Sequence, residues 1–428
     1  SLRSAKGVLL PQLSLSQNFS QIDRDRAAAS GGAQAQTSYR ASVGVSQVVL
    51  DDESFTRVRI ARESHRQAGY VERAERLDTL NDTGQAYLQL LSAEAALRVA
   101  EENFQVTQHN LELAQLRQRV GTSGPEEGYR FESQAAQQRA ELVDARAQVD
   151  RARVAFNRVL GVDVGTRWQL QDVTLEDPAF SFTTSRVIAL VHDPRKLDRF
   201  RAFAAIYAAN HSPDVAALQQ GLKTSELTAR EKSRRRFTPK VSASFNYSRA
   251  LHQDYAGPSL ADQLSDAGLP VHTTAADRND WTLGVTASIP IFSGGTLTAE
   301  ARKARADARR AEFSLASARE SVMAQTQAAL FAAESAYANI THSRRAADLA
   351  AQNLQVVQDK YEQGSVSIVT LLDAQNAAFA QRQSADAAVY NFLSQLLQFQ
   401  RALGWIEAAA TDAEKEAWLH EIEQAVAG

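Results

Sequence analysis

A helical segment of about sixty-five residues is the feature that most constrains the fold of this chain. It follows a turn at residues 293–295, is almost free of Gly and Pro, and ends at Gly364. A second helical run returns from about Val369 to Leu403. At about 1.5 Å per residue the outgoing helix reaches on the order of 100 Å, which is too long for an ordinary globular core. We therefore expect an elongated helical hairpin.

The first half of the chain repeats this pattern. A helical segment over about residues 53–120 is broken at residues 121–125, and a return segment over about residues 126–160 stops at Gly161. Gly364 follows Gly121 by 243 positions, and Gly404 follows Gly161 by the same 243. Apolar side chains recur at heptad spacing in both halves, which predicts helices packed side by side. The common register indicates an internal duplication.

Four shorter stretches alternate apolar and polar residues. They lie near residues 11–20, 39–49, 241–248 and 281–289, and the segments 22–38 and 250–280 are expected to be loops. One face of each stretch is apolar, and the other carries mostly Ser, Thr, Asn and Gly. A period of two with one apolar and one polar face predicts β-strands.

The composition narrows the class of protein. The chain has 428 residues, of which 44% are hydrophobic and 23% charged, as in a folded protein. The net charge of −3 gives no global attraction for nucleic acid. The absence of cysteine excludes disulfides. There is no run of eighteen apolar residues, but a membrane β-strand needs only about 9–11 alternating residues.

The strands leave two architectures open. Four strands cannot close a barrel of any width, so membrane strands require several chains to share one barrel with a wide, wet lumen. An aromatic girdle at the membrane boundary would then comprise Phe19, Tyr39, Tyr247 and Trp281. The alternative is a soluble or periplasmic coiled-coil interaction protein that carries two β-hairpins and has no pore.

Several local motifs together resemble the TolC family of outer-membrane efflux proteins. The similarity covers nearly the whole chain and is carried by residues 10–15, 283–295, 361–364, 371–375, 390–393 and 402–404. The resemblance implies an α+β membrane protein of mostly long coiled-coil helices. Three chains would form an α-barrel and a twelve-stranded β-barrel, with four strands from each chain. The implied location is the outer membrane of a Gram-negative bacterium, extending into the periplasm.

The resemblance also implies a division of the chain. Residues 11–50 and 237–292 would supply the membrane strands and external loops. The periplasmic α-barrel would use residues 51–161, 186–236 and 293–404. A mixed equatorial region would contain residues 162–185 and the tail 405–428, which we expect to be one polar helix of no clear role. Residues 1–10 match only the end of a family helix, so we expect them to be the remnant of a truncated N-terminal helix.

The two helical turns are the expected functional sites. By resemblance, Asp373 would ring the periplasmic entrance, Thr370 takes the place of a second acidic residue, and Tyr361 would help to hold the entrance shut. Glu127, with Glu126 beside it, matches the acidic position of the first turn. The simpler alternative is that Glu126, Glu127 and Asp373 lie in first turns and stabilise helix N-termini.

Partners are also implied by the resemblance. They are two further copies of the chain, outer-membrane lipid, a periplasmic adaptor, and an inner-membrane pump of the RND, ABC or MFS type, in efflux or type I secretion. Val366 replaces an arginine of the family. The adaptor would contact the turn residues Gly121, Thr122, Ser123, Gly124, Pro125, Gly364, Ser365, Val366 and Ser367.

No catalytic constellation is found in the sequence. The eight histidines are scattered, without the spacing of metal ligands, and residues 122–125 fit a helix-breaking turn better than a nucleophilic serine loop. We therefore expect no enzymatic activity, cofactor or metal, and no binding of nucleic acid. The function that the sequence favours is a passive exit duct that is gated at its periplasmic tip.

Overall fold

The computed structural model describes residues 2–121, 123–177, 180, 194–268 and 277–427. They form two compact units, which are described separately. The first contains Ser1–Gly69 and Ala217–Leu315, and the second contains Tyr70–Ala216 and Ala316–Gly428. In the described part of the chain, no helix is both long and apolar enough to span a membrane.

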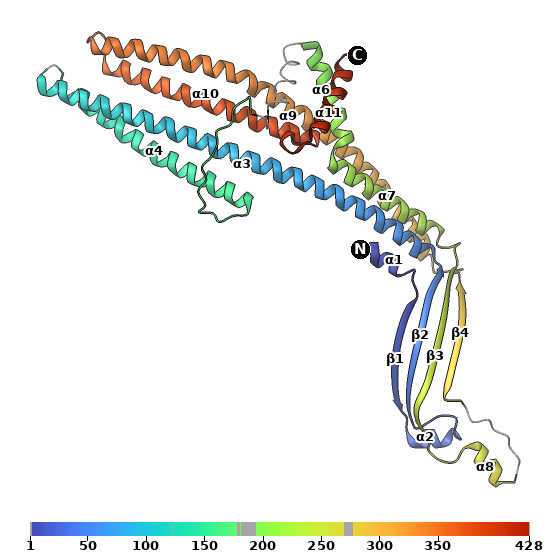
Figure 1. The fold of residues 1–428 in the computed structure, drawn as a ribbon. Coiled ribbons are helices and arrows are strands. Elements are labelled where there is room, and N and C mark those ends of the chain that lie inside the picture. Colours follow the sequence, from blue (N-terminus) through green and yellow to red (C-terminus); the bar gives the residue numbers. More distant parts are fainter. Residues whose placement is uncertain (1, 122, 178–179, 181–193, 269–276, 428) are drawn as a thin grey trace. The chain divides into compact units, whose positions relative to one another are not determined.

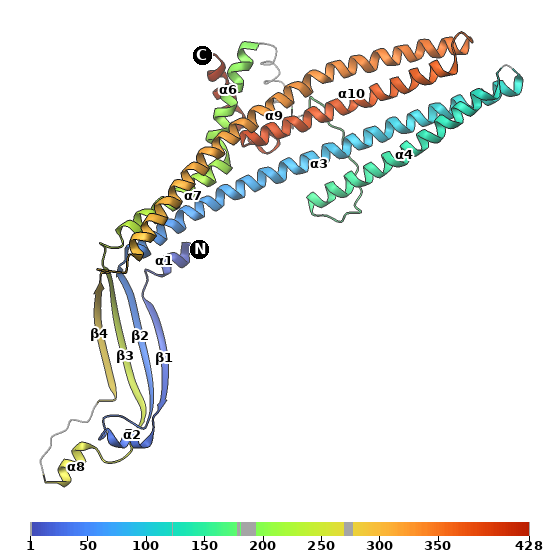
Figure 2. The same ribbon diagram turned by 180° about the vertical axis from the view of Figure 1, so that it is seen from behind.

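The first unit contains one antiparallel sheet of four strands in the order β1-β2-β3-β4 (Figures 1 and 2). The strands are β1 (Gln12–Gln21), β2 (Thr37–Leu50), β3 (Lys240–Asp254) and β4 (Asn279–Ser288). Within one chain, β1 and β4 each pair with a single neighbour, so both outer edges of the sheet are open. The predicted strands are confirmed, and the duplicated halves lie side by side through β2 and β3.

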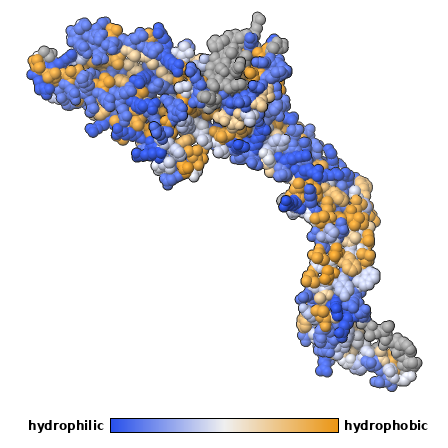
Figure 3. All heavy atoms as spheres, in the orientation of Figure 1, coloured by the Kyte–Doolittle hydropathy of each residue, from blue (hydrophilic) through white to orange (hydrophobic). Residues whose placement is uncertain are grey.

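The strand register sorts the side chains by polarity. Leu13, Val45, Phe245 and Leu283 form one cross-strand row, and Leu15, Val43, Tyr247 and Trp281 form another on the same face. Polar rows alternate with these, for example Ser14, Gly44, Asn246 and Thr282. Successive strand residues point to opposite faces, so the sheet has one apolar and one polar face. Hydrophobic side chains are visible along the strands in Figure 3.

The loops differ from the sequence prediction. Residues 22–38 include the short helix α2 (Arg24–Ala29), and residues 250–280 include α8 (Leu260–Asp266). Strand β3 continues six residues beyond Ser248, where the alternation ends. The register shifts between Tyr39 and Arg40, so one extra residue of β3 lies opposite β2. Such a bulge reverses the phase of the alternation and therefore hides the end of the strand from a period-two search.

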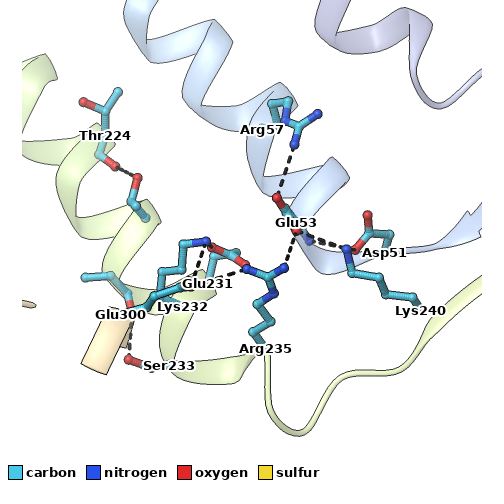
Figure 4. A network of polar contacts seen from close by, with 12 residues as sticks. Asp51, Glu53, Arg57, Thr224, Glu231, Lys232, Ser233, Arg235, Lys240 and Glu300 are labelled. Atoms are coloured by element: carbon cyan, nitrogen blue, oxygen red, sulfur yellow. Dashed lines mark hydrogen bonds and ion pairs between the residues drawn. The ribbon is translucent and has the colours of Figure 1, made fainter. Parts of the chain in front are cut away.

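A charge network connects the ends of the helices next to this sheet (Figure 4). Helix α3 (Asp52–Val120) begins directly after β2, α7 (Pro213–Arg234) ends before β3, and α9 (Thr296–Glu362) begins after β4. Arg235 lies 3.4 Å from both Glu53 of α3 and Glu300 of α9. Ion pairs between partly buried groups thus hold the starts of α3 and α9 against the end of α7.

The second unit is built from two long hairpins. Helix α3 returns through α4 (Pro125–Leu160), and α9 returns through α10 (Ile368–Leu403), close to the predicted bounds. Helix α3 packs closely on α10 at Gly84, where an added Cβ would lie 2.7 Å from Leu397 Cδ1. A larger residue at Gly84 would require the buried Leu397 side chain to move.

The C-terminal segment was predicted wrongly. Helix α11 (Asp412–Ala427) is not polar throughout, because Trp418, Ile422 and Val426 are buried at a spacing of four residues. They join the main apolar cluster together with Phe200 of α6 (Pro194–His211). Charged residues between them lowered the average hydropathy and concealed an apolar stripe that is only one residue wide.

The remaining segments agree with the prediction where the structure describes them. Residues 2–7 form the short helix α1 (Leu2–Gly7), and residues 162–177 contain no helix or strand. The tail is the exception, because a separate turn of 3-10 helix (Glu407–Ala409) precedes α11, so residues 405–428 are not one helix as predicted. Of the segment predicted to be irregular, residues 178–179 and 181–185 lie outside the described residues. The same holds for residues 186–193 of the segment 186–236, which was assigned to the α-barrel.

Candidate functional site: the paired hairpin tips

The two hairpin turns have the conformations that helix ends require. Gly121 (φ 80°) and Gly364 (φ 74°) lie in the left-handed region, which costs a glycine little and a side chain more. Ser365 donates its backbone N–H to the Lys360 carbonyl at 2.8 Å, which closes the end of α9. Ser367 then caps α10, since its Oγ accepts the N–H of Thr370 at 3.4 Å.

An apolar cluster beneath the turns joins the two hairpins. Its buried members are Ala114 of α3, Phe131 of α4, and Ile368 and Leu371 of α10. Phe131 is fully buried, and Tyr361 of α9 packs against the same cluster. All four long helices therefore contribute to one small core at the tips. This core brings the polar groups of the two turns within reach of each other.

Tyr361 connects the hairpins through a polar contact above this core. Its hydroxyl donates to Glu127 Oε2 at 3.1 Å, and the guanidinium carbon of Arg117 lies 5.0 Å from the centre of its ring. A tyrosine on α9 is thus held between a carboxylate of α4 and a cation of α3. The contact is a candidate latch, because opening the tips apart would break the hydrogen bond and expose the ring.

The environment keeps the Tyr361 hydroxyl protonated. Burial, followed by the negative charge of Glu127 and the hydrogen bond to it, raises the pKa of Tyr361 from 10.0 to about 12, and Arg117 opposes this shift. A neutral phenol remains a donor at every physiological pH. The latch therefore does not titrate through Tyr361 near neutral pH.

A second polar layer lies further along the helices. Gln375 of α10 is 1% exposed and donates to Asn103 Oδ1 at 3.1 Å and to Thr107 Oγ1 at 2.7 Å. Its carbonyl oxygen accepts from Asn110 at 3.3 Å. Every polar atom of this buried amide has a partner on α3, so the layer fixes the register of α10 on α3.

The predicted gate residues are placed differently from one another. Glu127 is half-buried in the latch, whereas Glu126, Thr370 and Asp373 are exposed. Glu126 and Glu127 lie in the first turn of α4, as the simpler alternative requires. Asp373 does not, because α10 begins at Ile368 and has no acidic residue in its first turn. For Asp373 the interpretation as a helix N-terminal charge is therefore wrong.

The predicted adaptor-contact residues lie in the two turns. Gly121, Gly124, Pro125 and Ser123 belong to the first turn, and Thr122 lies outside the described residues. Gly364, Ser365, Val366 and Ser367 form the second turn; Val366 is half-buried and the other three are exposed.

Sequence reasoning missed the cation of the latch. Because Val366 replaces the family arginine, the second turn offers no cation at that position. Arg117 of the other hairpin supplies the cation beside Tyr361. Its only signal in the sequence is its position in the last turn of α3, four residues before Gly121, where basic residues commonly favour a helix C-terminus.

Of the four predicted girdle residues, Phe19, Tyr39 and Trp281 lie near the loop ends of their strands, whereas Tyr247 lies at the centre of β3 and not near a strand end as predicted. Phe19 pairs with Tyr39, and Tyr247 pairs with Trp281. The two pairs occupy different levels, since Tyr247 faces Val43, four residues along β2 from Tyr39. Four residues correspond to roughly 13 Å along a strand. Phe19 and Trp281 are 63% and 66% exposed in the single chain.

A metal centre has no support in the part of the chain that the structure describes. No group of three or more His, Asp or Glu side chains converges there in a way that could hold a metal ion.

The comparison with known families decides the identity of the chain. The model of the family described as outer membrane efflux protein matches residues 1–162 and 207–405. The chain belongs to this family. It is therefore an outer-membrane protein that extends into the periplasm and acts as an exit duct for efflux. The efflux family is a family of transport ducts.

Individual members of the efflux family are similar to this chain over most of its length. The outer membrane protein TolC of Vibrio cholerae is 22% identical over 411 residues, which are 94% of this chain and 83% of that protein. The solved structure of VceC, also from Vibrio cholerae, matches with a TM-score of 0.72 at 16% identity and covers 94% of this chain and 89% of that one.

A second solved structure matches with a similar score. The open state of the MtrE outer membrane channel of Neisseria gonorrhoeae gives a TM-score of 0.70 at 17% identity. It covers 96% of this chain and 84% of that chain. These structures share the fold of the chain, a mostly helical protein with four antiparallel strands.

Proposed function

We propose that three copies of this chain form one passive channel whose periplasmic entrance is the pair of hairpin tips. The observation that carries the proposal is the four-stranded sheet, which has an apolar and a polar face and two open edges. Open edges are not tolerated in lipid, so each β4 must pair with the β1 of another copy. Twelve strands would then enclose a lumen lined by Ser, Thr, Asn and Gly.

In this arrangement each segment of the chain would form a particular part of the channel. Residues 11–50 and 237–292 would form the membrane barrel and its external loops. Residues 51–161, 186–236 and 293–404 would form the periplasmic helical barrel. Residues 162–185 and 405–428 would belong to the equatorial region.

The latch of Arg117, Glu127 and Tyr361 would hold the entrance closed. Each copy would contribute one latch, so opening would require three hydrogen bonds to be exchanged for contacts with water or with a partner. Exposed Asp373 would add a ring of three carboxylates near the axis. Like charges around a narrow axis repel each other and attract cations, which makes the ring a site for block by multivalent cations.

The partners would be a periplasmic adaptor and an inner-membrane pump. The adaptor would bind the turns at residues 121–125 and 364–367, where its docking could release the latch. The pump would supply the energy and select the cargo, because a wide, wet lumen selects little. The chain itself would catalyse no reaction and bind no cofactor.

Reconstitution into planar lipid bilayers tests the proposal. The purified protein should migrate as a trimer in mild detergent and give discrete conductance steps. Magnesium or a trivalent hexaammine cation on the periplasmic side should block the wild type, and Asp373→Asn should weaken the block. A folded trimer without conductance would contradict the channel, and unchanged block in the variant would remove Asp373 from the entrance.

A further inference from the structure

The chain segments that flank one end of the sheet carry a strong positive charge. The strands are antiparallel, so the start of β1, the end of β2, the start of β3 and the end of β4 meet at this end. The flanking segments are residues 1–11, 51–62, 231–240 and 289–310. Together they contain 15 Lys and Arg and 6 Asp and Glu, a net charge of +9. We call these four segments the collar.

The opposite end of the sheet has no such excess. Its connecting segments, residues 22–36 and 255–278, contain 3 Lys and Arg and 5 Asp and Glu, a net charge of −2. The whole chain carries −3. The positive charge is therefore concentrated at the end of the sheet that joins the helices.

The acidic residues of the collar are largely neutralised within it (Figure 4). Lys240 pairs with Asp51 and Glu53, Arg234 pairs with Asp52, and Lys232 and Arg235 share Glu300. In the described part of the chain, no ion pair involves Arg236, Arg302 or Lys303, and all three side chains are exposed. These three cations therefore direct their charge outward.

Large apolar side chains are exposed on the same collar. Ile291 is 96% exposed, Phe292 86% and Phe237 68%. The guanidinium of Arg236 lies 4.6 Å from the centre of the Phe237 ring, so cation and aromatic side chain form one amphipathic unit. Exposed apolar side chains beside unpaired cations suit a lipid surface, where acyl chains and anionic headgroups lie within a short distance of each other.

The position of Arg302 and Lys303 along α9 allows their side chains to reach lipid headgroups. Arg302 and Lys303 are the seventh and eighth residues of α9, so they lie roughly 10 Å of helix rise from its start. The interfacial layer on each side of a bilayer is about 5–7 Å thick. Long basic side chains placed just below a lipid-facing sheet can reach back to the headgroups.

We propose that the collar binds the headgroups of anionic phospholipids in the leaflet that faces the helices. The phosphodiester would contact Arg236, Arg302 and Lys303, and the acyl chains would lie against Phe237, Ile291 and Phe292. The proposal rests on the membrane placement of the strands in the proposed function. It adds a lipid specificity and an asymmetry between the two ends of the sheet.

Native mass spectrometry of the full chain in detergent tests the proposal. The probes are phosphatidylglycerol and phosphatidylcholine with the same acyl chains. The wild type should bind phosphatidylglycerol more tightly. The triple variant R236Q/R302Q/K303Q should bind it about a hundredfold more weakly, at about fivefold for each basic residue. Its binding of phosphatidylcholine should not change.

A matched triple variant controls for charge alone. R24Q/R26Q/R278Q removes three exposed arginines at the opposite end of the sheet and should bind phosphatidylglycerol as the wild type does. Equal binding of the two lipids by the wild type would overturn the proposal. So would equal weakening in both triple variants.

Two further measurements keep the test decisive. If the collar variant does not fold, the wild-type preference for phosphatidylglycerol should still disappear as salt rises from about 0.05 to 0.5 M, because screening weakens exposed charge contacts. A preference that resists salt contradicts the proposal. Inorganic phosphate should not displace the lipid; displacement would identify a phosphate site instead. Wild-type conductance in bilayers tests the channel separately, whatever the lipid result.

Discussion

Removal of one hydroxyl group tests the latch at the hairpin tips. Tyr361→Phe keeps the ring in the apolar cluster and deletes the donor to Glu127 Oε2, which lies 3.1 Å away. A hydrogen bond to a charged group contributes about 1.5–3 kcal/mol. Arg117 stays beside the ring, so we take the lower figure, about 1.5 kcal/mol for each chain. Since 1.4 kcal/mol is a factor of ten, the closed tip of each chain should lose about tenfold in population relative to the open one, and a channel whose three tips open together should lose about a thousandfold.

Single-channel recording in planar bilayers measures this change. Because all three latches of the proposed channel are changed, the ratio of open to closed time in Tyr361→Phe should rise about a thousandfold over the wild type at the same voltage, or about tenfold where one tip opens independently of the others. Tyr390→Phe is the matched control, because Tyr390 also donates to a carboxylate, Asp172, at 2.8 Å. Burial also raises the pKa of Tyr390 to about 12. It should lose comparable thermal stability and leave the open probability unchanged. Equal effects of the two substitutions, or none in Tyr361→Phe, would refute the latch.

Two further predictions concern stability and are read from thermal or denaturant unfolding. Gly84→Ala should destabilise by about 1–3 kcal/mol, because the new Cβ meets Leu397 of α10 at 2.7 Å. Gly69→Ala in the same helix meets nothing within 4 Å and should instead stabilise by about 0.5–1 kcal/mol; equal effects would contradict the close packing of α3 on α10. Burial raises the pKa of Glu231 above its ordinary value of 4.5, so the folded state favours the protonated acid. The contribution of Glu231 to folding stability is therefore fully present below pH 4.5 and is lost as the pH rises through the folded-state pKa. Glu231→Gln should therefore stabilise the folded state at pH 7 and have no effect near pH 4; a loss of stability at pH 7 would show that the ion pair with Lys232 outweighs burial.

The elements with regular periods could be predicted from the sequence. The heptad pattern of apolar residues and the glycines at positions 121 and 364 predict two helical hairpins. The pattern is uninterrupted up to each glycine, so the helices are expected to end there. The alternation of the strands depends on the same kind of local signal. The duplication was readable because both halves keep a common offset of 243 residues.

Features that depend on contacts between distant segments could not be predicted. The apolar stripe of α11 is only one residue wide and becomes evident when α6 covers it. The bulge beside Tyr39 depends on the pairing of β2 with β3, which are about two hundred residues apart. Neither feature leaves a periodic pattern in its own segment.

The residues of the candidate site also include some that the sequence predicts and some that it does not. Tyr361 and Glu127 were expected at the tips from the resemblance to a known family. Arg117 was not expected there, because it lies on the other hairpin, far from Tyr361 in the sequence. Gln375 was noted only as part of a motif, and its role became evident from its three partners on α3. A sequence identifies residue types, but the pairing of two long helices decides which side chains meet.

The account depends most on the two faces of the strands, and cysteine accessibility tests them directly. The chain has no cysteine, so Ser42→Cys on the polar face and Val43→Cys on the apolar face can be compared without background. During conductance recording, a bulky, charged, water-soluble thiol reagent should reduce the current through Ser42→Cys stepwise and leave Val43→Cys unaffected. Block of both variants, or of Val43→Cys alone, would contradict a water-filled tube lined by the polar faces of these strands.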